Sequence, residues 1–128
     1  MTIHYRIDAS SNRIMTRVLG EVTIDEALQH FDELSVDPSY EPGMDALLDL
    51  TDCETLLDVD KIRTAAARAT ADLSTLRFGR MAIVVASEAL FGMLRMFHTL
   101  SESAFSEVQI FRDRDEALQW LGGSGSTH

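Results

Sequence analysis

The sequence has few of the features that cross-link a protein, anchor it in a membrane or direct it to secretion. Cys53 is the single cysteine among 128 residues, so an internal disulfide is excluded and a reducing cytoplasm fits best. The longest strongly apolar run, Met81–Ala86, is far shorter than the roughly 20 residues that span a bilayer. Residues Met1–Ser10 lack the charged and then apolar order of a secretion signal. We therefore expect a cytoplasmic protein with no membrane insertion.

Basic residues are also scarce. The chain has 11 lysines and arginines against 21 acidic residues, which gives a formal charge of −10 and a pI near 4.6. The negative electrostatic potential of such a chain repels the phosphate groups of DNA and RNA, so nucleic acid is an unfavourable partner. A content of 45% hydrophobic and 25% charged residues is that of a soluble globular protein, and 128 residues leave room for one domain.

The spacings that metal, phosphate and dinucleotide sites require are missing. The histidines His4, His30, His98 and His128 fall on separate segments, with no pair at zinc-ligand spacing. A calcium loop begun at Asp49 would have a cysteine and a glutamate at its fifth and sixth positions, where an oxygen ligand and glycine are needed. The glycines are isolated and form no phosphate-binding loop. We expect no metal and no cofactor.

Nucleophilic catalysis is equally poorly supported. Ser87 follows a predicted strand but lacks the flanking glycines of a hydrolase elbow. Cys53 has acidic neighbours on both sides, which disfavour a thiolate. The sequence therefore predicts no catalytic residues and a protein that is not an enzyme.

Apolar periodicity predicts an α/β fold. Strict alternation marks an N-terminal hairpin, and helical spacing recurs between the later strands, in the order ββαβαβαβα. Single helices between strands imply parallel neighbours, so we expect a five-stranded mixed, mostly parallel sheet with an antiparallel N-terminal edge. The predicted strands are Ile3–Asp8, Arg13–Leu19, Met44–Leu50, Arg80–Ala86 and Val108–Phe111. The predicted helices begin at a Thr23–Glu26 capping box, after Asp58, at Ala89 and after Asp113.

Two further expectations concern the middle and the end of the chain. The segment Arg80–Ala86 is almost continuously apolar, as in a central strand covered on both faces. The last helix is expected to end at Leu121. Residues 1–121 then form the single domain, and the glycine-rich residues 122–128 form a flexible tail.

Polar residues follow three of the predicted strands. Ligands of open parallel sheets bind beyond the carboxyl ends of the strands, so these residues are ligand-binding candidates. The alternative is that each one only caps a helix or forms a turn. The candidates are Thr51, Asp52, Ser87, Glu88, Arg112 and Asp113.

The predicted helix Ala89–Ser101 is more apolar than a helix on a sheet needs to be. Its apolar arc covers roughly 220°, about twice the usual stripe, and leaves only Gly92, Arg95 and Thr99 for water. The excess predicts either a homodimer interface, which we favour, or a pocket for an apolar small molecule, unless neighbouring helices bury it all. The residues assigned to this surface are Phe91, Met93, Met96 and Leu100.

The order and spacing of several short segments resemble the SpoIIAA-like family, which belongs with the STAS and SEC14-like domains. The resemblance extends over roughly Met1–Leu121. It implies an α/β domain without established chemistry, related in fold to bacterial anti-anti-sigma factors and to lipid-binding domains. The segments that carry it are Gly20–Thr23, Asp37–Tyr40, Leu48–Leu50, Arg80–Val84, Leu90–Phe97, Val108–Asp113 and Glu116–Leu121.

The chain departs from the anti-anti-sigma pattern at one position that matters for function. Those relatives carry a phosphorylated serine just after the third strand, whereas the matching stretch Asp49–Thr55 has threonines, no serine and several acidic residues. We therefore expect Thr51 and Thr55 not to be phosphorylated. The leading hypothesis is a non-enzymatic regulatory or interaction domain that contacts a protein or binds a small apolar or lipid-like ligand. The alternatives are a small hydrolase or transferase, and a structural subunit.

Overall fold

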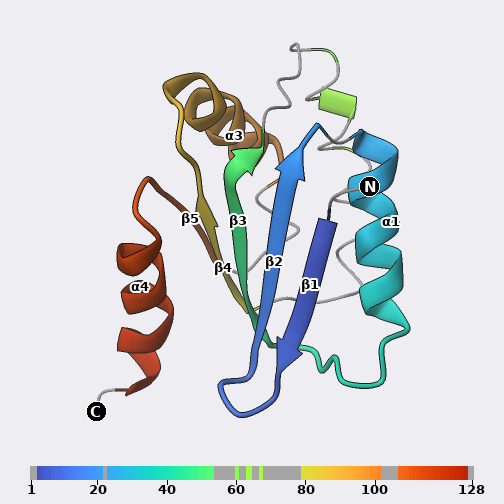
Figure 1. The fold of residues 1–128 in the computed structure, drawn as a ribbon, viewed down its shortest axis with the longest axis vertical. Coiled ribbons are helices and arrows are strands. Elements are labelled where there is room, and N and C mark those ends of the chain that lie inside the picture. The colour runs from blue at the N-terminus through green and yellow to red at the C-terminus, as the bar shows by residue number, and fades with distance from the viewer. Residues whose placement is uncertain are drawn as a thin grey trace.

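A computed structural model describes residues 3–21, 23–53, 60, 63–64, 67, 79–101 and 107–126. Five strands form one sheet in the order β1-β2-β3-β4-β5 (Figure 1). Strand β1 is antiparallel to β2, and all later neighbours are parallel, as expected from the sequence. The strands are β1 Ile3–Asp8, β2 Arg13–Gly20, β3 Asp45–Cys53, β4 Arg80–Val84 and β5 Glu107–Phe111. The helices are α1 Ile24–Ser35, α3 Glu88–Ser101 and α4 Arg114–Ser126.

Local signals set where these helices begin. The Thr23 hydroxyl accepts from the Glu26 backbone N–H at 3.1 Å, and the Glu26 carboxylate accepts from the Thr23 N–H at 2.8 Å. This is the capping box predicted for α1. At the start of α4, Asp113 Oδ1 accepts from the Asp115 N–H at 2.9 Å. The helix expected after Asp58 falls largely outside the described residues.

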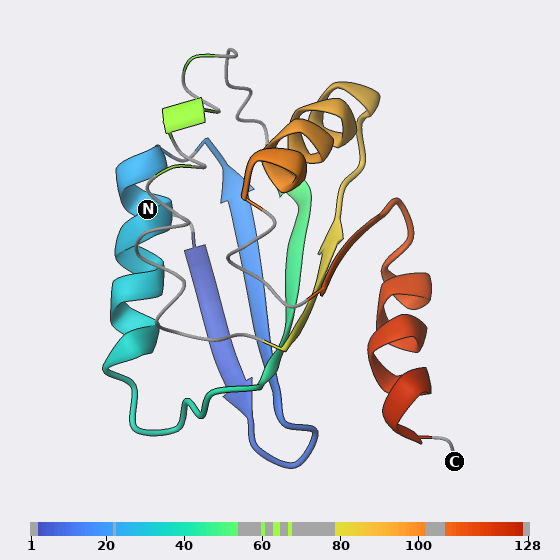
Figure 2. The same ribbon diagram turned by 180° about the vertical axis from the view of Figure 1, so that it is seen from behind.

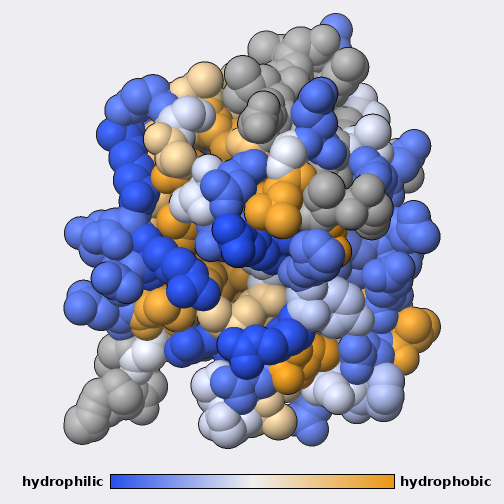
Figure 3. All heavy atoms as spheres, in the orientation of Figure 1, coloured by the Kyte–Doolittle hydropathy of each residue, from blue (hydrophilic) through white to orange (hydrophobic). Residues whose placement is uncertain are grey.

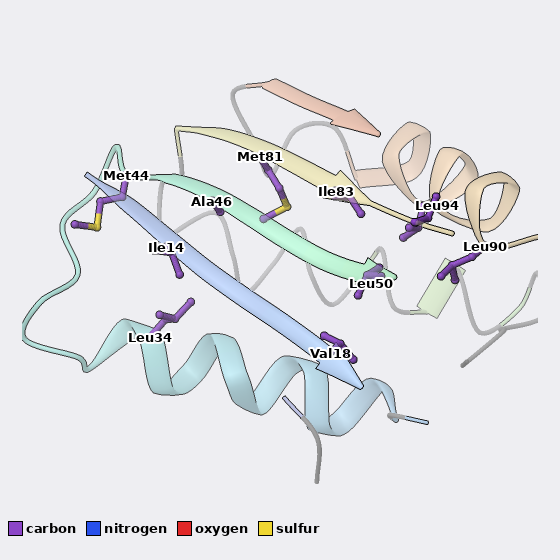
Figure 4. Packing of buried hydrophobic residues seen from close by; sticks show 11 residues of the cluster. Ile14, Val18, Leu34, Met44, Ala46, Leu50, Met81, Ile83, Leu90 and Leu94 are labelled. Carbon is purple, nitrogen blue, oxygen red and sulfur yellow. The ribbon is translucent and has the colours of Figure 1, made fainter. Parts of the chain in front are cut away.

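The two faces of the sheet hold separate hydrophobic cores. Helices α1 and α3 cover one face, and α4 packs on the other against β3, β4 and β5 (Figure 2). Alternate residues of β4 divide between them, because Met81 and Ile83 belong to the first core, and Ala82 and Val84 to the second. Figure 4 shows the first core, with Leu34 of α1 below the sheet and residues of α3 at its far end.

The ends of β3 and β4 differ from the sequence prediction. Strand β3 continues past Leu50 to Cys53, because β2 runs on to Gly20 and a register shift after Arg17 lets the two strands keep pairing. The fourth strand ends at Val84 instead of Ala86. It lies between β3 and β5, so the middle position of the sheet belongs to β3.

Helix α4 continues to Ser126, past the end predicted at Leu121. Glycine disfavours a helix interior by about 0.5 to 1 kcal/mol relative to alanine, so helix propensity does not account for this extension. The Arg80 guanidinium holds the helix just before the extension, since it donates to the carbonyls of Trp120, at 2.9 Å, and of Leu121.

Candidate functional site

The first pair of strand-end candidates lies within β3 and not beyond it. Thr51 donates its backbone N–H and its hydroxyl to Asp49 Oδ1, at 3.0 and 2.7 Å. Asp52 forms an ion pair with Arg17 of β2 at 2.5 Å. Both interactions are internal to the sheet, so these polar groups stabilise the end of the strand.

The second pair begins helix α3. The Ser87 hydroxyl accepts from the Leu90 N–H at 3.1 Å, which caps the helix. The Glu88 carboxylate accepts two contacts of 2.6 Å from the Arg112 guanidinium. This bidentate ion pair ties the start of α3 to the segment after β5.

The third pair is Arg112 and Asp113, and Arg112 contacts a member of the second pair. Arg112 holds Glu88 and also stacks over the Phe91 ring, with its guanidinium carbon 4.5 Å from the ring centroid. Asp113 caps α4. The structure therefore joins Glu88 to Arg112, but shows no direct contact among the described residues between this group and Thr51 or Asp52.

A looser link connects the end of β3 to α4. Arg114 Nε lies 3.6 Å from Asp49 Oδ2, and the Asp49 residue is only 9% exposed. The Asp49 carboxylate therefore lies beside the Arg114 cation and accepts two hydrogen bonds from Thr51. All six predicted residues therefore have structural partners. Ser87 and Asp113 cap helices, whereas the other four are held by hydrogen bonds or ion pairs.

Sequence reasoning missed a buried polar pair beneath α1. His30 Nε2 lies 3.3 Å from the Thr16 hydroxyl, and the two residues are 5% and 6% exposed. Burial lowers the pKa of His30 from 6.5 to about 4, so the imidazole is neutral. The signal in the sequence was the i+4 spacing of His30 and the buried Leu34 on an amphipathic helix.

The pair lies beside a small cavity and a second polar contact. The cavity has a volume of about 10 Å³ and is lined by Thr16, His30 and apolar core residues. This is about the space that one water molecule needs. The Tyr5 ring lies 5.1 Å from the His30 ring, and its hydroxyl donates to Asp37 at 2.8 Å. Burial, together with this hydrogen bond, raises the pKa of Tyr5.

Helix α3 leaves part of its apolar arc uncovered. Leu90 and Leu94 are buried in the first core, whereas Phe91 and Met93 are only partly buried against it. Met96 is 39% exposed. We call Phe91, Met93 and Met96 the α3 surface. The fourth predicted member, Leu100, has a side chain outside the described set.

The described residues contain no group of three or more histidine, cysteine, aspartate or glutamate side chains that could hold a metal ion. None of their helices is long and apolar enough to cross a membrane.

Comparisons with known proteins identify the fold. The family model described as SpoIIAA-like matches residues 13–122. A solved structure of an uncharacterized protein from the DUF3478 family of Shewanella loihica PV-4, described as having a SpoIIAA-like fold, is similar with a TM-score of 0.64. The two sequences are 21% identical, and the match covers 94% of each chain. A comparison with curated proteins gave no match.

Proposed function

The chain belongs to the SpoIIAA-like family, and we propose that it is a non-enzymatic, cytoplasmic regulatory domain that acts through protein contact. The observation that carries this proposal is the α3 surface, where Met96 is 39% exposed beside two partly buried apolar residues. Methionine offers the adaptable apolar contact favoured at recognition surfaces. The free thiol of Cys53 is consistent with a reducing compartment.

The occupant of the α3 surface that we favour is a second copy of the chain. Two such surfaces related by a twofold axis would place Met96 against its own counterpart or against Phe91, removing both from water. Phe91 is prepared for such a contact, because Arg112 stacks on its ring and is itself held by Glu88. A stacked aromatic side chain loses little further freedom on binding.

The geometry favours protein contact over the other candidates. The cavity beside Thr16, which described residues line, has about 10 Å³ and is itself too small for a lipid-like molecule. The polar side chains at the strand ends are engaged with one another and with helix termini, which leaves them poorly placed for hydrolase or transferase chemistry.

Sedimentation velocity at micromolar concentration tests the proposal. The parent protein should sediment as a dimer, and Met96→Glu should shift it to the monomer by placing a charge in the interface. Val36→Glu is the matched control, because Val36 is 81% exposed at the end of α1 and should not affect association. A parent that is monomeric throughout this range contradicts the dimer.

Native mass spectrometry of freshly purified protein tests the competing interpretation. If the parent protein retains an apolar small molecule and Met96→Glu does not, the α3 surface is a ligand pocket and not a dimer interface. Turnover on an esterase or phosphatase panel that Ser87→Ala abolishes would contradict a non-enzymatic domain.

A further inference from the structure

A cluster of three side chains joins the α3 surface to the end of β5. Glu88 and Phe91 lie in the first half of α3, whereas Arg112 follows directly after β5. The two terminal nitrogens of the Arg112 guanidinium each lie 2.6 Å from a different oxygen of the Glu88 carboxylate. The guanidinium also lies over the Phe91 ring, with its carbon 4.5 Å from the ring centroid. We call these three side chains the Arg112 cluster.

Helix geometry brings both α3 members of this cluster within reach of one cation. Residues three apart on a helix are neighbours on its surface, so Glu88 and Phe91 place a carboxylate beside an aromatic ring. A guanidinium is planar, and its edge can bind both carboxylate oxygens while its face remains available to a ring. Phe91 is therefore held by a residue outside its own helix.

The second cation near this ring holds it less closely. The Arg95 guanidinium carbon lies 6.0 Å from the Phe91 centroid, at the outer limit of such an attraction. Figure 3 shows hydrophobic and strongly hydrophilic side chains next to each other at the end of the molecule where α3 lies. The apolar α3 surface thus borders directly on charged groups, and Arg112 is the one that holds Phe91.

The ion pair of the Arg112 cluster is open to dissolved ions. The side chains of Arg112 and Glu88 are 54% and 75% exposed, so added salt screens their attraction. A guanidinium that leaves the carboxylate no longer restrains the ring beneath it. A side chain that is mobile in the free chain must lose this freedom when it becomes part of an interface, and the loss weakens association.

We propose that the Arg112 cluster regulates self-association through the α3 surface by making it sensitive to ionic strength. This inference rests on the proposed function, because it requires the dimer. A twofold dimer contains two such clusters, so the effect on one chain counts twice in the dissociation constant. Its sign is opposite to the general action of salt, which screens the repulsion between two chains of formal charge −10 and so favours their association.

Sedimentation equilibrium at about 50 mM and about 500 mM NaCl tests this regulation. At low salt, Arg112→Gln should raise the dissociation constant of the dimer about fivefold or more, because each chain contributes a factor of about two. At high salt, parent and variant should differ by less than about twofold, since the ion pair of the parent is already screened. Glu88→Gln keeps the cation but removes its carboxylate partner, and it should also weaken the dimer at low salt.

Arg17→Gln is the matched control. It breaks the ion pair with Asp52, which joins β2 to β3, has side chains 58% and 52% exposed, and changes the net charge by the same amount. This variant should leave the dissociation constant within about twofold of the parent at both salt concentrations. Circular dichroism of each variant checks that the fold is kept.

The possible results separate this inference from the dimer itself. If the parent dimerises and neither Arg112→Gln nor Glu88→Gln weakens the dimer at low salt, the regulation is wrong and the dimer stands. Equal weakening by Arg112→Gln and Arg17→Gln also overturns the regulation, because net charge alone would then explain it. A parent that is monomeric at both salt concentrations overturns the dimer and the regulation together.

Discussion

The buried histidine should make the protein less stable in mild acid. The His30 imidazole is 5% exposed, 3.3 Å from the Thr16 hydroxyl and 5.1 Å from the Tyr5 ring. Burial lowers its pKa from 6.5 to about 4, because an imidazolium in this position would lose its hydration. Protonation of this side chain is therefore coupled to unfolding.

The direction and size of this pH dependence follow from the pKa values of His30 in the unfolded and folded chain. Between pH 6.5 and about 4, the unfolded chain binds a proton that the folded chain does not, so the free energy of unfolding decreases as the pH falls. The contribution of His30 is fully present above pH 7. Its loss amounts to about 2 kcal/mol at pH 5 and about 3 kcal/mol at pH 4. A small domain has a total of only about 5 to 15 kcal/mol.

Urea unfolding at pH 8 and pH 5 measures this contribution. In His30→Gln the side chain stays polar and neutral at both pH values. The decrease in the free energy of unfolding from pH 8 to pH 5 should therefore be smaller than in the parent by about 2 kcal/mol. His4→Gln is the control, because His4 is exposed on β1, and this variant should show the same loss of stability as the parent. Equal losses in the parent and His30→Gln would refute the coupling.

Three single positions give further predictions. A Cβ added at Gly79 would lie 2.5 Å from the Gly43 carbonyl oxygen, whereas one at Gly92 meets nothing within 4 Å. Calorimetry should therefore show Gly79→Ala destabilised by about 2 kcal/mol or more, and Gly92→Ala stabilised by up to about 1 kcal/mol through its higher helix propensity. Val84 is 0% exposed in the second core, so Val84→Asp should fail to fold; a soluble variant that melts cooperatively would contradict its placement there.

Much of the fold could be predicted because the signals for it are local. Alternation in Ile3–Asp8 and a capping box at Thr23 fix the first hairpin and the start of α1, and the structure confirms both. The end of β3 could not be predicted in this way. Its last residues look polar and turn-like, and they stay in the sheet only because Gly20 of β2 pairs with Cys53 after a register shift.

The strand-end residues were harder to interpret because capping and ligand binding use the same side chains. Ser87 and Asp113 were correctly suspected as caps from their positions before helices. The partner of Glu88 is Arg112, 24 residues away, and no local pattern marks such a pair. The neighbours of His30 could not be predicted from sequence spacing, because His30 lies on α1 whereas Tyr5 and Thr16 lie on β1 and β2.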